Sequence, residues 1–161
     1  PTPTPTPTPT QTPTPAPTAT PGGDLITDLT TYDGNDWYIQ EDLQEGDVQY
    51  DDRPYEFTDV PSSVEGCDWI RTDNDSNYYT SNPICTFDIS QDAYVYVAHS
   101  DDATTKPSWM STWTDTGDDL INDEYIPRSF SLYRKFYSAG EVSLGNNGDT
   151  GAGFYTIIVK P

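Results

Sequence analysis

The apolar residues of this chain fall into short runs, and no stretch of ten or more residues keeps the spacing of an amphipathic helix. The run Ala93–His99 is aromatic, β-branched and small until its final histidine, which predicts a strand buried on both faces. Val95 and Val97 share one face of this strand, because successive side chains point in opposite directions. Tyr94 and Tyr96 point to the other face.

Other runs have the length and composition of strands and are separated by turn residues. Asp24–Thr31 stays open between a strand and a loose lead-in. We expect a long polar loop over Asp101–Asn122 and a hairpin turn over Gly145–Gly153. The pattern predicts an all-β, antiparallel β-sandwich of jelly-roll-like type, with strands at Trp37–Ile39, Asp47–Tyr50, Tyr55–Val60, Cys67–Thr72, Ile84–Ile89, Ala93–His99, Phe130–Tyr137, Glu141–Leu144 and Phe154–Lys160.

Residues 1–23 are almost entirely proline and threonine. Proline fixes φ and disfavours helix at the residue before it, so this segment predicts an extended polyproline II linker. Residues 24–161 then form a single folded domain of ordinary size. Spacers of this kind join catalytic domains to accessory modules, so we expect a catalytic domain upstream in the same protein, and the chain shows no signal peptide of its own.

The chain is strongly acidic, with 27 acidic and seven basic residues and a formal net charge of −20. Such a surface repels nucleic acid and anionic membranes, which excludes both as partners. No apolar stretch approaches the roughly 18 residues of a membrane span. A saline or marine habitat and ordinary extracellular acidity explain the charge equally well.

Cys67 and Cys85 each lie at the edge of a strand-like run. In an extracellular chain the first interpretation is a disulfide, which would contribute on the order of 3 kcal/mol. Two free thiols are the alternative. We do not expect a zinc site, because two cysteines and one distant histidine do not supply four ligands.

Several runs together resemble a recurring module, among them Gly66–Thr72, Val95–His99, Lys106–Trp109, Trp113–Gly117 and Phe154–Val159. The pattern is similar to C-terminal β-sandwich accessory modules of secreted bacterial polysaccharide-degrading enzymes, such as polysaccharide lyases. The resemblance covers about Trp37 to Lys160. It implies a carbohydrate-binding accessory role and names no ligand.

Trp109 and Trp113 are the foremost binding candidates, because the faces of sugar rings stack on flat aromatic rings. Their alternative role is to close the end of the sandwich, since tryptophan is highly buried on average. Trp69 lies in an alternating strand and is expected in the core, while Trp37 stays open.

An acidic glycan needs local cations, and Arg53, Arg71, Lys106 and Arg128 lie in or beside predicted loops. The alternative is that these cations pair with some of the acidic residues. His99, the only histidine, ends its strand and joins the ligand candidates; a local hydrogen bond is its alternative role.

Oxygen-rich clusters indicate a structural calcium ion, with Asp73, Asp75, Asp118 and Asp119 as candidate ligands. An EF-hand is excluded, because the expected glycine and glutamate are missing. No nucleophile elbow or phosphate-binding loop occurs.

We therefore predict a secreted, non-catalytic and monomeric carbohydrate-binding module, which targets a tethered enzyme to a plant or algal polysaccharide. An acidic glycan of the pectic, alginate or ulvan type is one candidate ligand, and aromatic stacking supplies the affinity. Two alternatives stay open. One is a structural or adhesion module without a glycan ligand, and the other is a small polysaccharide lyase domain.

Overall fold

A computed structural model describes residues 24–161, so the predicted linker at residues 1–23 lies outside the described residues. This part of the chain is all-β, and its two short 3-10 helices are too short to cross a bilayer. The predicted antiparallel β-sandwich is confirmed. Its elements are β1 (Ile26–Thr31), β2 (Tyr38–Gln40), β3 (Phe57–Asp59), β4 (Asp68–Arg71), η1 (Asn74–Tyr78), β5 (Cys85–Ile89), β6 (Ala93–Ser100), η2 (Ser108–Met110), β7 (Thr114–Asn122), β8 (Arg128–Tyr137), β9 (Gly140–Leu144) and β10 (Thr156–Lys160).

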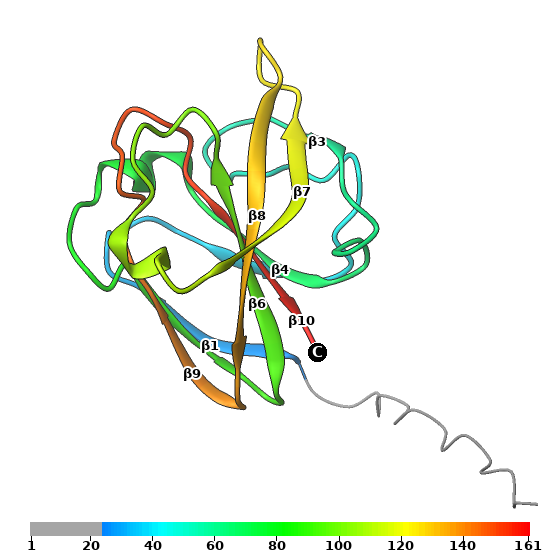
Figure 1. The fold of residues 1–161 in the computed structure, drawn as a ribbon, viewed down its shortest axis with the longest axis vertical. Helices are drawn as coiled ribbons and strands as arrows, with labels where there is room; N and C mark the ends of the chain where they lie inside the picture. The colour runs from blue at the N-terminus through cyan, green and yellow to red at the C-terminus, as the bar shows by residue number, and fades with distance from the viewer. Residues whose placement is uncertain (1–23) are drawn as a thin grey trace, which may run out of the picture.

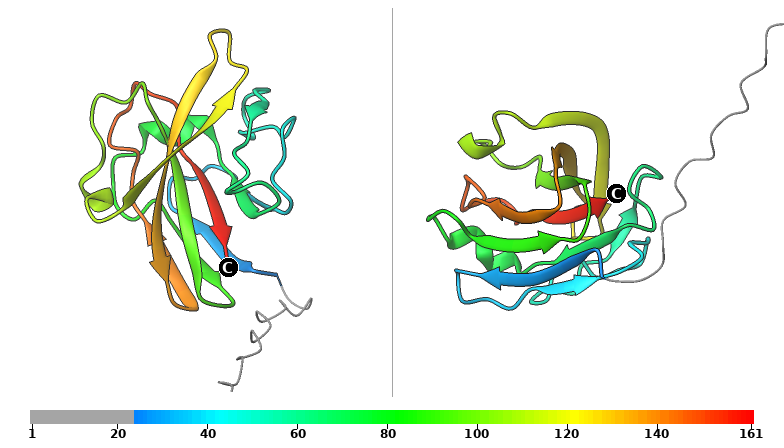
Figure 2. Two further views of the ribbon diagram at one scale, coloured as in Figure 1. Left: turned by 45° about the vertical axis from the view of Figure 1, so that its right-hand side comes forward. Right: turned by 90° about the horizontal axis from the view of Figure 1, so that it is seen from below.

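The strands form two sheets that pack face to face (Figures 1 and 2). The smaller sheet has the order β1-β5-β9, and the larger has the order β2-β4-β10-β6-β8-β7-β3. The hairpin between β7 and β8 extends beyond the body of the sandwich at the top of Figure 1. Consecutive strands often lie in different sheets, so long loops cross between the layers at the ends of the sandwich.

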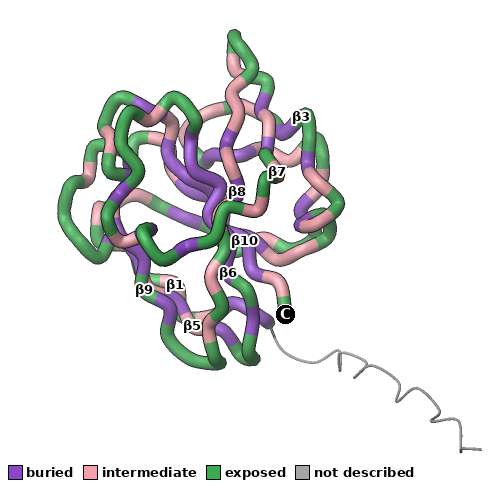
Figure 3. Tube along the Cα trace, viewed as in Figure 1, coloured by how far each residue is buried: buried purple, intermediate pink, exposed green. Residues whose placement is uncertain are grey.

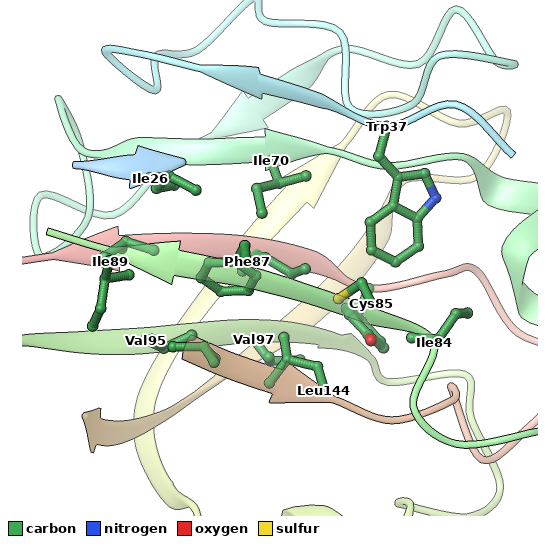
Figure 4. Packing of buried hydrophobic residues seen from close by; sticks show 14 of the residues in the cluster. Ile26, Trp37, Ile70, Ile84, Cys85, Phe87, Ile89, Val95, Val97 and Leu144 are labelled. Atoms are coloured by element: carbon green, nitrogen blue, oxygen red, sulfur yellow. The ribbon is translucent and has the colours of Figure 1, made fainter. Parts of the chain in front are cut away.

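The main core fills the space between the two sheets. Phe87 and Ile89 of β5 point from the smaller sheet toward Val95 and Val97 of β6, as Figure 4 shows. Ile70 of β4 joins them from the larger sheet. All five side chains are buried, as expected for alternating strands that share an apolar interior.

The opposite face of the larger sheet carries a second apolar cluster, which the chain between β2 and β4 covers. The central strands β6 and β10 are therefore buried on both faces (Figure 3). This confirms the interpretation of Ala93–His99, with Tyr94 as the exception at 39% exposed. Trp69 is buried as predicted, and the cluster consists of Leu43, Phe57, Val60, Val64, Trp69, Tyr96, Ala98, Leu120, Phe130, Leu132 and Ile158.

Two predicted loops are wrong in their extent or form. The long loop ends at residue 113, because β7 begins at Thr114. Residues 114–119 of β7 are polar and largely exposed near the edge of the larger sheet, so they show no apolar alternation. Gly145–Gly153 is not a hairpin turn, since β9 pairs with β5 while β10 pairs with β4 and β6. It is a crossing between the two sheets.

The predicted disulfide between Cys67 and Cys85 is wrong, and both thiols are free. Cys85 lies on β5 in the core between the sheets, where burial raises the pKa of its thiol. Cys67 packs against the cluster on the far face of the larger sheet. That sheet separates the two sulfur atoms, so closeness in the sequence does not bring them together.

Candidate functional site

Three loops meet at the end of the sandwich on the left and top of Figure 1: residues 72–84, 101–113 and 145–155. The Thr104 backbone N–H donates to Asp149 Oδ2 at 2.8 Å. Asn146 Nδ2 donates to the Thr80 carbonyl at 2.9 Å, and Asn77 Nδ2 donates to the Ala152 carbonyl at 2.9 Å. These bonds tie all three loops into one surface.

Trp109 lies in η2 and is half-buried. Its Nε1 donates to the Asn146 carbonyl at 2.8 Å, and its ring meets Trp113 edge-on at a centroid distance of 5.6 Å. Gly145 lies so close to the ring that an added Cβ would be 2.4 Å from Trp109 Cδ1. The indole is therefore held in one orientation by groups on the core side.

The exposed part of Trp109 borders a shallow hollow of about 320 Å³. Lys106 lies at the same hollow, with Nζ 4.5 Å from the centroid of the Tyr133 ring, and forms no ion pair within residues 24–161. Two of the predicted ligand residues thus lie at one surface. We call it the Trp109 hollow, and it is lined by Asn82, Thr105, Lys106, Pro107, Ser108, Trp109, Asn146 and Gly148.

Trp113 and His99 are buried, with 6% and 5% of their surfaces exposed. Trp113 packs between Trp109 and Tyr137, which is the end-closing role left open by the sequence. His99 Nε2 lies 3.0 Å from the Asn147 carbonyl, and burial lowers the pKa of the imidazole. Both residues support the loops from inside, so the prediction of ligand contact rests on Trp109 and Lys106.

Arg71 and Arg53 lie elsewhere and are already paired. Arg71 Nη2 donates to Asp51 Oδ1 at 2.8 Å, and its guanidinium lies over the Tyr38 ring. Arg53 bridges Asp52 and Asp75 at 2.5 and 2.6 Å. The alternative interpretation, pairing with acidic residues, therefore describes these two arginines.

The predicted metal ligands separate into two groups. Asp73 and Asp75 converge with Asp52, which the sequence did not indicate, and Arg53 neutralises part of their charge. Asp118 instead accepts a hydrogen bond from the Ser63 hydroxyl at 2.6 Å. Asp118 and its neighbour Asp119 join no such convergence in the described part of the chain. Calcium binding stays a prediction, with Asp52 added to its candidate ligands.

A second hollow, of about 250 Å³, lies between η1, the β7–β8 hairpin and residues 150–153. Sequence reasoning missed it, because its walls come from segments far apart in the chain. Arg128, named from the sequence as a candidate partner of an acidic glycan, is one of its lining residues. We call it the Arg128 hollow, and it is lined by Asn74, Asn77, Tyr78, Asp102, Glu124, Arg128, Thr150, Gly151, Ala152 and Gly153.

Hydrogen bonds fix the geometry of the Arg128 hollow. Arg128 donates through Nη1 to Asp102, and its Nε lies 3.4 Å from Glu124 Oε2. The bond to Asp102 and the nearby charge of Glu124 raise the pKa of the guanidinium, so it is permanently charged. Asn122, buried at the base of the hairpin, accepts from the Glu124 and Arg128 backbone N–H groups at 3.3 and 3.2 Å.

Comparisons with known proteins place this fold within longer enzymes. No family model matches the chain. A β-glucuronidase of Formosa agariphila is 27% identical over 128 residues, which cover 76% of this chain and 13% of that protein. The structure of a β-glucuronidase from glycoside hydrolase family 2 superposes with a TM-score of 0.77 at 21% identity, covering 87% of this chain and 15% of the other.

A GH138 enzyme targeting pectin rhamnogalacturonan II superposes less closely, with a TM-score of 0.56 at 11% identity over 82% of this chain and 16% of the other. The chain therefore spans 13% to 16% of the lengths of these proteins. The shared part is a β-sandwich within carbohydrate-active enzymes. These matches are glycoside hydrolases, so the resemblance to polysaccharide lyases stays a prediction.

Proposed function

We propose that residues 24–161 form a non-catalytic, secreted module that binds an acidic plant or algal polysaccharide for an enzyme tethered through residues 1–23. The observation that carries this proposal is the Trp109 hollow, where a fixed indole lies beside Lys106, a cation without an ion pair in the described residues 24–161. The indole offers a flat surface for a sugar ring, and the ammonium offers an ionic partner for its carboxylate.

The comparisons support the tethered role. The chain matches a small part of each enzyme, which suits a domain that accompanies a catalytic domain. One of the matched proteins is a β-glucuronidase, and another is an enzyme targeting a pectin. Their names therefore refer to a uronic acid and to pectin, which suits an acidic glycan as the ligand. A module of this kind raises the effective concentration of its enzyme near the substrate.

The net charge of −20 opposes long-range attraction of a polyanion. That repulsion is screened beyond about 8 Å at physiological ionic strength, so contact within the hollow decides the binding. Within residues 24–161, Lys106 forms no ion pair and its Nζ lies over the Tyr133 ring, so its charge is free to meet a carboxylate.

The test measures retention of the full chain on insoluble pectin, alginate, ulvan and cellulose, followed by calorimetry with an oligogalacturonide. We expect retention on at least one acidic polysaccharide and an affinity that falls about tenfold in Lys106→Met. Lys135→Met is the matched control, since Lys135 also lies over a tyrosine ring, that of Tyr137. Equal losses of affinity in both variants would contradict the assignment of ligand contact to Lys106. No retention on any of the four polysaccharides would support a structural module.

A further inference from the structure

The Arg128 hollow differs in charge from the Trp109 hollow. It holds one guanidinium between two carboxylates, those of Asp102 and Glu124. A ligand carboxylate entering it would meet a guanidinium that is already bonded and two groups of its own sign. The hollow is therefore unsuited to a uronate and suited to a ligand that has hydroxyl groups and no charge.

Its polar groups match sugar hydroxyls in type. Carboxylates accept hydrogen bonds, a guanidinium donates several in a fixed plane, and an amide does both. Asn77 adds a second observation: it is buried, at 7% exposed, and its Oδ1 has no hydrogen-bond partner among the described residues. Its Nδ2 is held by the Ala152 carbonyl, so the side chain is fixed with one acceptor unsatisfied at the wall of the hollow.

Tyr78 supplies the apolar surface that such a site needs. It ends η1, lines the hollow and is 69% exposed, so most of its ring surface is open to a ligand. The backbone beneath it is fixed, because Asn74 Oδ1 accepts from the Phe154 N–H at 3.1 Å. A ring placed in this way can stack on a sugar while the ion pairs hold its hydroxyls.

The size of the hollow limits the ligand. Its volume of about 250 Å³ lies below the roughly 300–1,000 Å³ of pockets that enclose drug-sized molecules. One sugar ring fits this space better than a longer segment of chain. Residues 150–153 form one wall, and exposed Thr150 and Gly151 leave that side open to solvent.

We infer that the Arg128 hollow is a second saccharide site, which takes a single uncharged sugar residue between Tyr78 and the Asp102–Arg128–Glu124 ion pairs. This rests on the proposed function, that the module binds glycans, and adds to it the class of sugar at a separate site. A heteroglycan that carries neutral side residues on a uronate chain presents both kinds of sugar at once.

The test is an NMR titration of the full chain with uncharged galacto-, arabino- and xylo-oligosaccharides, and separately with an oligogalacturonide. We expect at least one uncharged probe to shift the signals of Tyr78, the Arg128 side chain and Gly151 to Gly153. Tyr78→Ala should raise the dissociation constant of that probe about tenfold. Tyr32→Ala is the matched control, because Tyr32 is also an exposed tyrosine, at 48%, and lines neither hollow.

The outcomes separate this inference from the proposed function. If the oligogalacturonide shifts Trp109 while no uncharged probe shifts Tyr78, the second site is absent and the proposed function stands. If uncharged probes bind at Tyr78 and no acidic glycan binds, the second site stands and the assignment to Lys106 fails. The inference would be overturned if the Arg128 hollow preferred the oligogalacturonide. It would also be overturned if Tyr78→Ala and Tyr32→Ala changed the dissociation constant of the uncharged probe equally.

Discussion

The two hollows lie at the same end of the sandwich but are built in different ways. The Trp109 hollow is an extension of the aromatic core, since Trp109 contacts Trp113 and Tyr155, which both lie in the core cluster. The Arg128 hollow is a polar assembly, in which every wall is held by a hydrogen bond or ion pair. The first owes its rigidity to packing, and the second owes it to polar contacts between distant segments.

This difference has consequences for mutation. A change beneath the Trp109 hollow must alter the core, so stability and binding fall together. A change at the surface of the Arg128 hollow removes an exposed group, so binding can fall while the fold stays intact. Substitutions beneath the Trp109 hollow should therefore lower both stability and affinity, whereas substitutions at the surface of the Arg128 hollow should lower affinity alone.

The largest expected effect comes from Trp113→Ala, which removes a buried indole below the Trp109 hollow. Such truncations cost about 3–5 kcal/mol of unfolding free energy. Tyr78→Ala, at the Arg128 hollow, should change it by less than about 0.5 kcal/mol, because the side chain is largely exposed. Urea denaturation of the two variants measures the contrast. Similar losses of unfolding free energy in both would show that the two hollows do not differ in how they depend on the core.

Gly145→Ala should have the next largest effect, because the new Cβ would lie 2.4 Å from Trp109 Cδ1 and 2.6 Å from Asn82 Oδ1. The ring must move, and overpacking of this kind costs about 1–3 kcal/mol. We expect a changed tryptophan fluorescence spectrum and weaker binding of the oligogalacturonide. Gly151→Ala is the control, since its Cβ would meet only the Asp149 carboxylate, at 3.3 Å.

A result in which Gly145→Ala weakens the uncharged probe at Tyr78 as strongly as the acidic one would show that the hollows are coupled. The two share the loop at 145–155, so this is the route by which coupling would travel. Unchanged fluorescence in Gly145→Ala would instead show that the indole is less tightly held than its contacts indicate.

The sequence predicted the frame of the molecule, and it named Trp109 and Lys106, which the structure places at one hollow. Strands such as β6 and β10 carry their own signal, because β-branched and aromatic residues fill both faces. Trp109 and Lys106 are three residues apart, so one local motif brings them together. The contacts that fix Trp109, above all that with Gly145, depend on a distant loop and give no local signal.

The Arg128 hollow could not be predicted in the same way. Asn77, Asp102 and Arg128 meet only because of the strand order of the larger sheet and the crossing loops. The same limitation explains the disulfide, since the face on which Cys67 lies is set by packing and not by its spacing from Cys85. β7 was missed because an exposed strand of acidic and small residues lacks the alternation that marks a half-buried one.

Arg128→Met tests the polar contacts of the Arg128 hollow and should cause a moderate loss of stability. It removes a partly exposed guanidinium and leaves Asp102 and Glu124 as unpaired like charges. Each partly exposed ion pair contributes little to stability, so we expect the unfolding free energy to fall by about 1 kcal/mol. Binding of the uncharged probe should be lost at the same time. Arg71→Met, which breaks the pair with Asp51 outside both hollows, should match the stability loss and keep the binding. Retained binding of the uncharged probe in Arg128→Met would contradict the saccharide site.

The smallest expected effect is a pH dependence of the unfolding free energy that arises from Asp73, at the start of η1. Asp73 caps this helix by accepting the Asp75 N–H at 2.8 Å. Burial, and then the charge of Asp52, raises the pKa of Asp73 from 3.8 to about 6. A carboxyl with a raised folded-state pKa favours folding fully below its unfolded value, and that contribution is lost as the pH rises through about 6.

Asp73→Asn keeps an oxygen that can accept the Asp75 N–H and removes the charge. It should therefore stabilise the fold at pH 7 by about 0.5–1 kcal/mol, a figure discounted for partial exposure, and by almost nothing near pH 3. Urea denaturation at the two pH values measures this, with Asp118→Asn as a control on β7. Equal gains at both pH values would show that the substitution acts through something other than the ionised carboxylate. A gain at pH 7 that calcium ions abolish would show instead that Asp73 belongs to a metal site beside the Arg128 hollow.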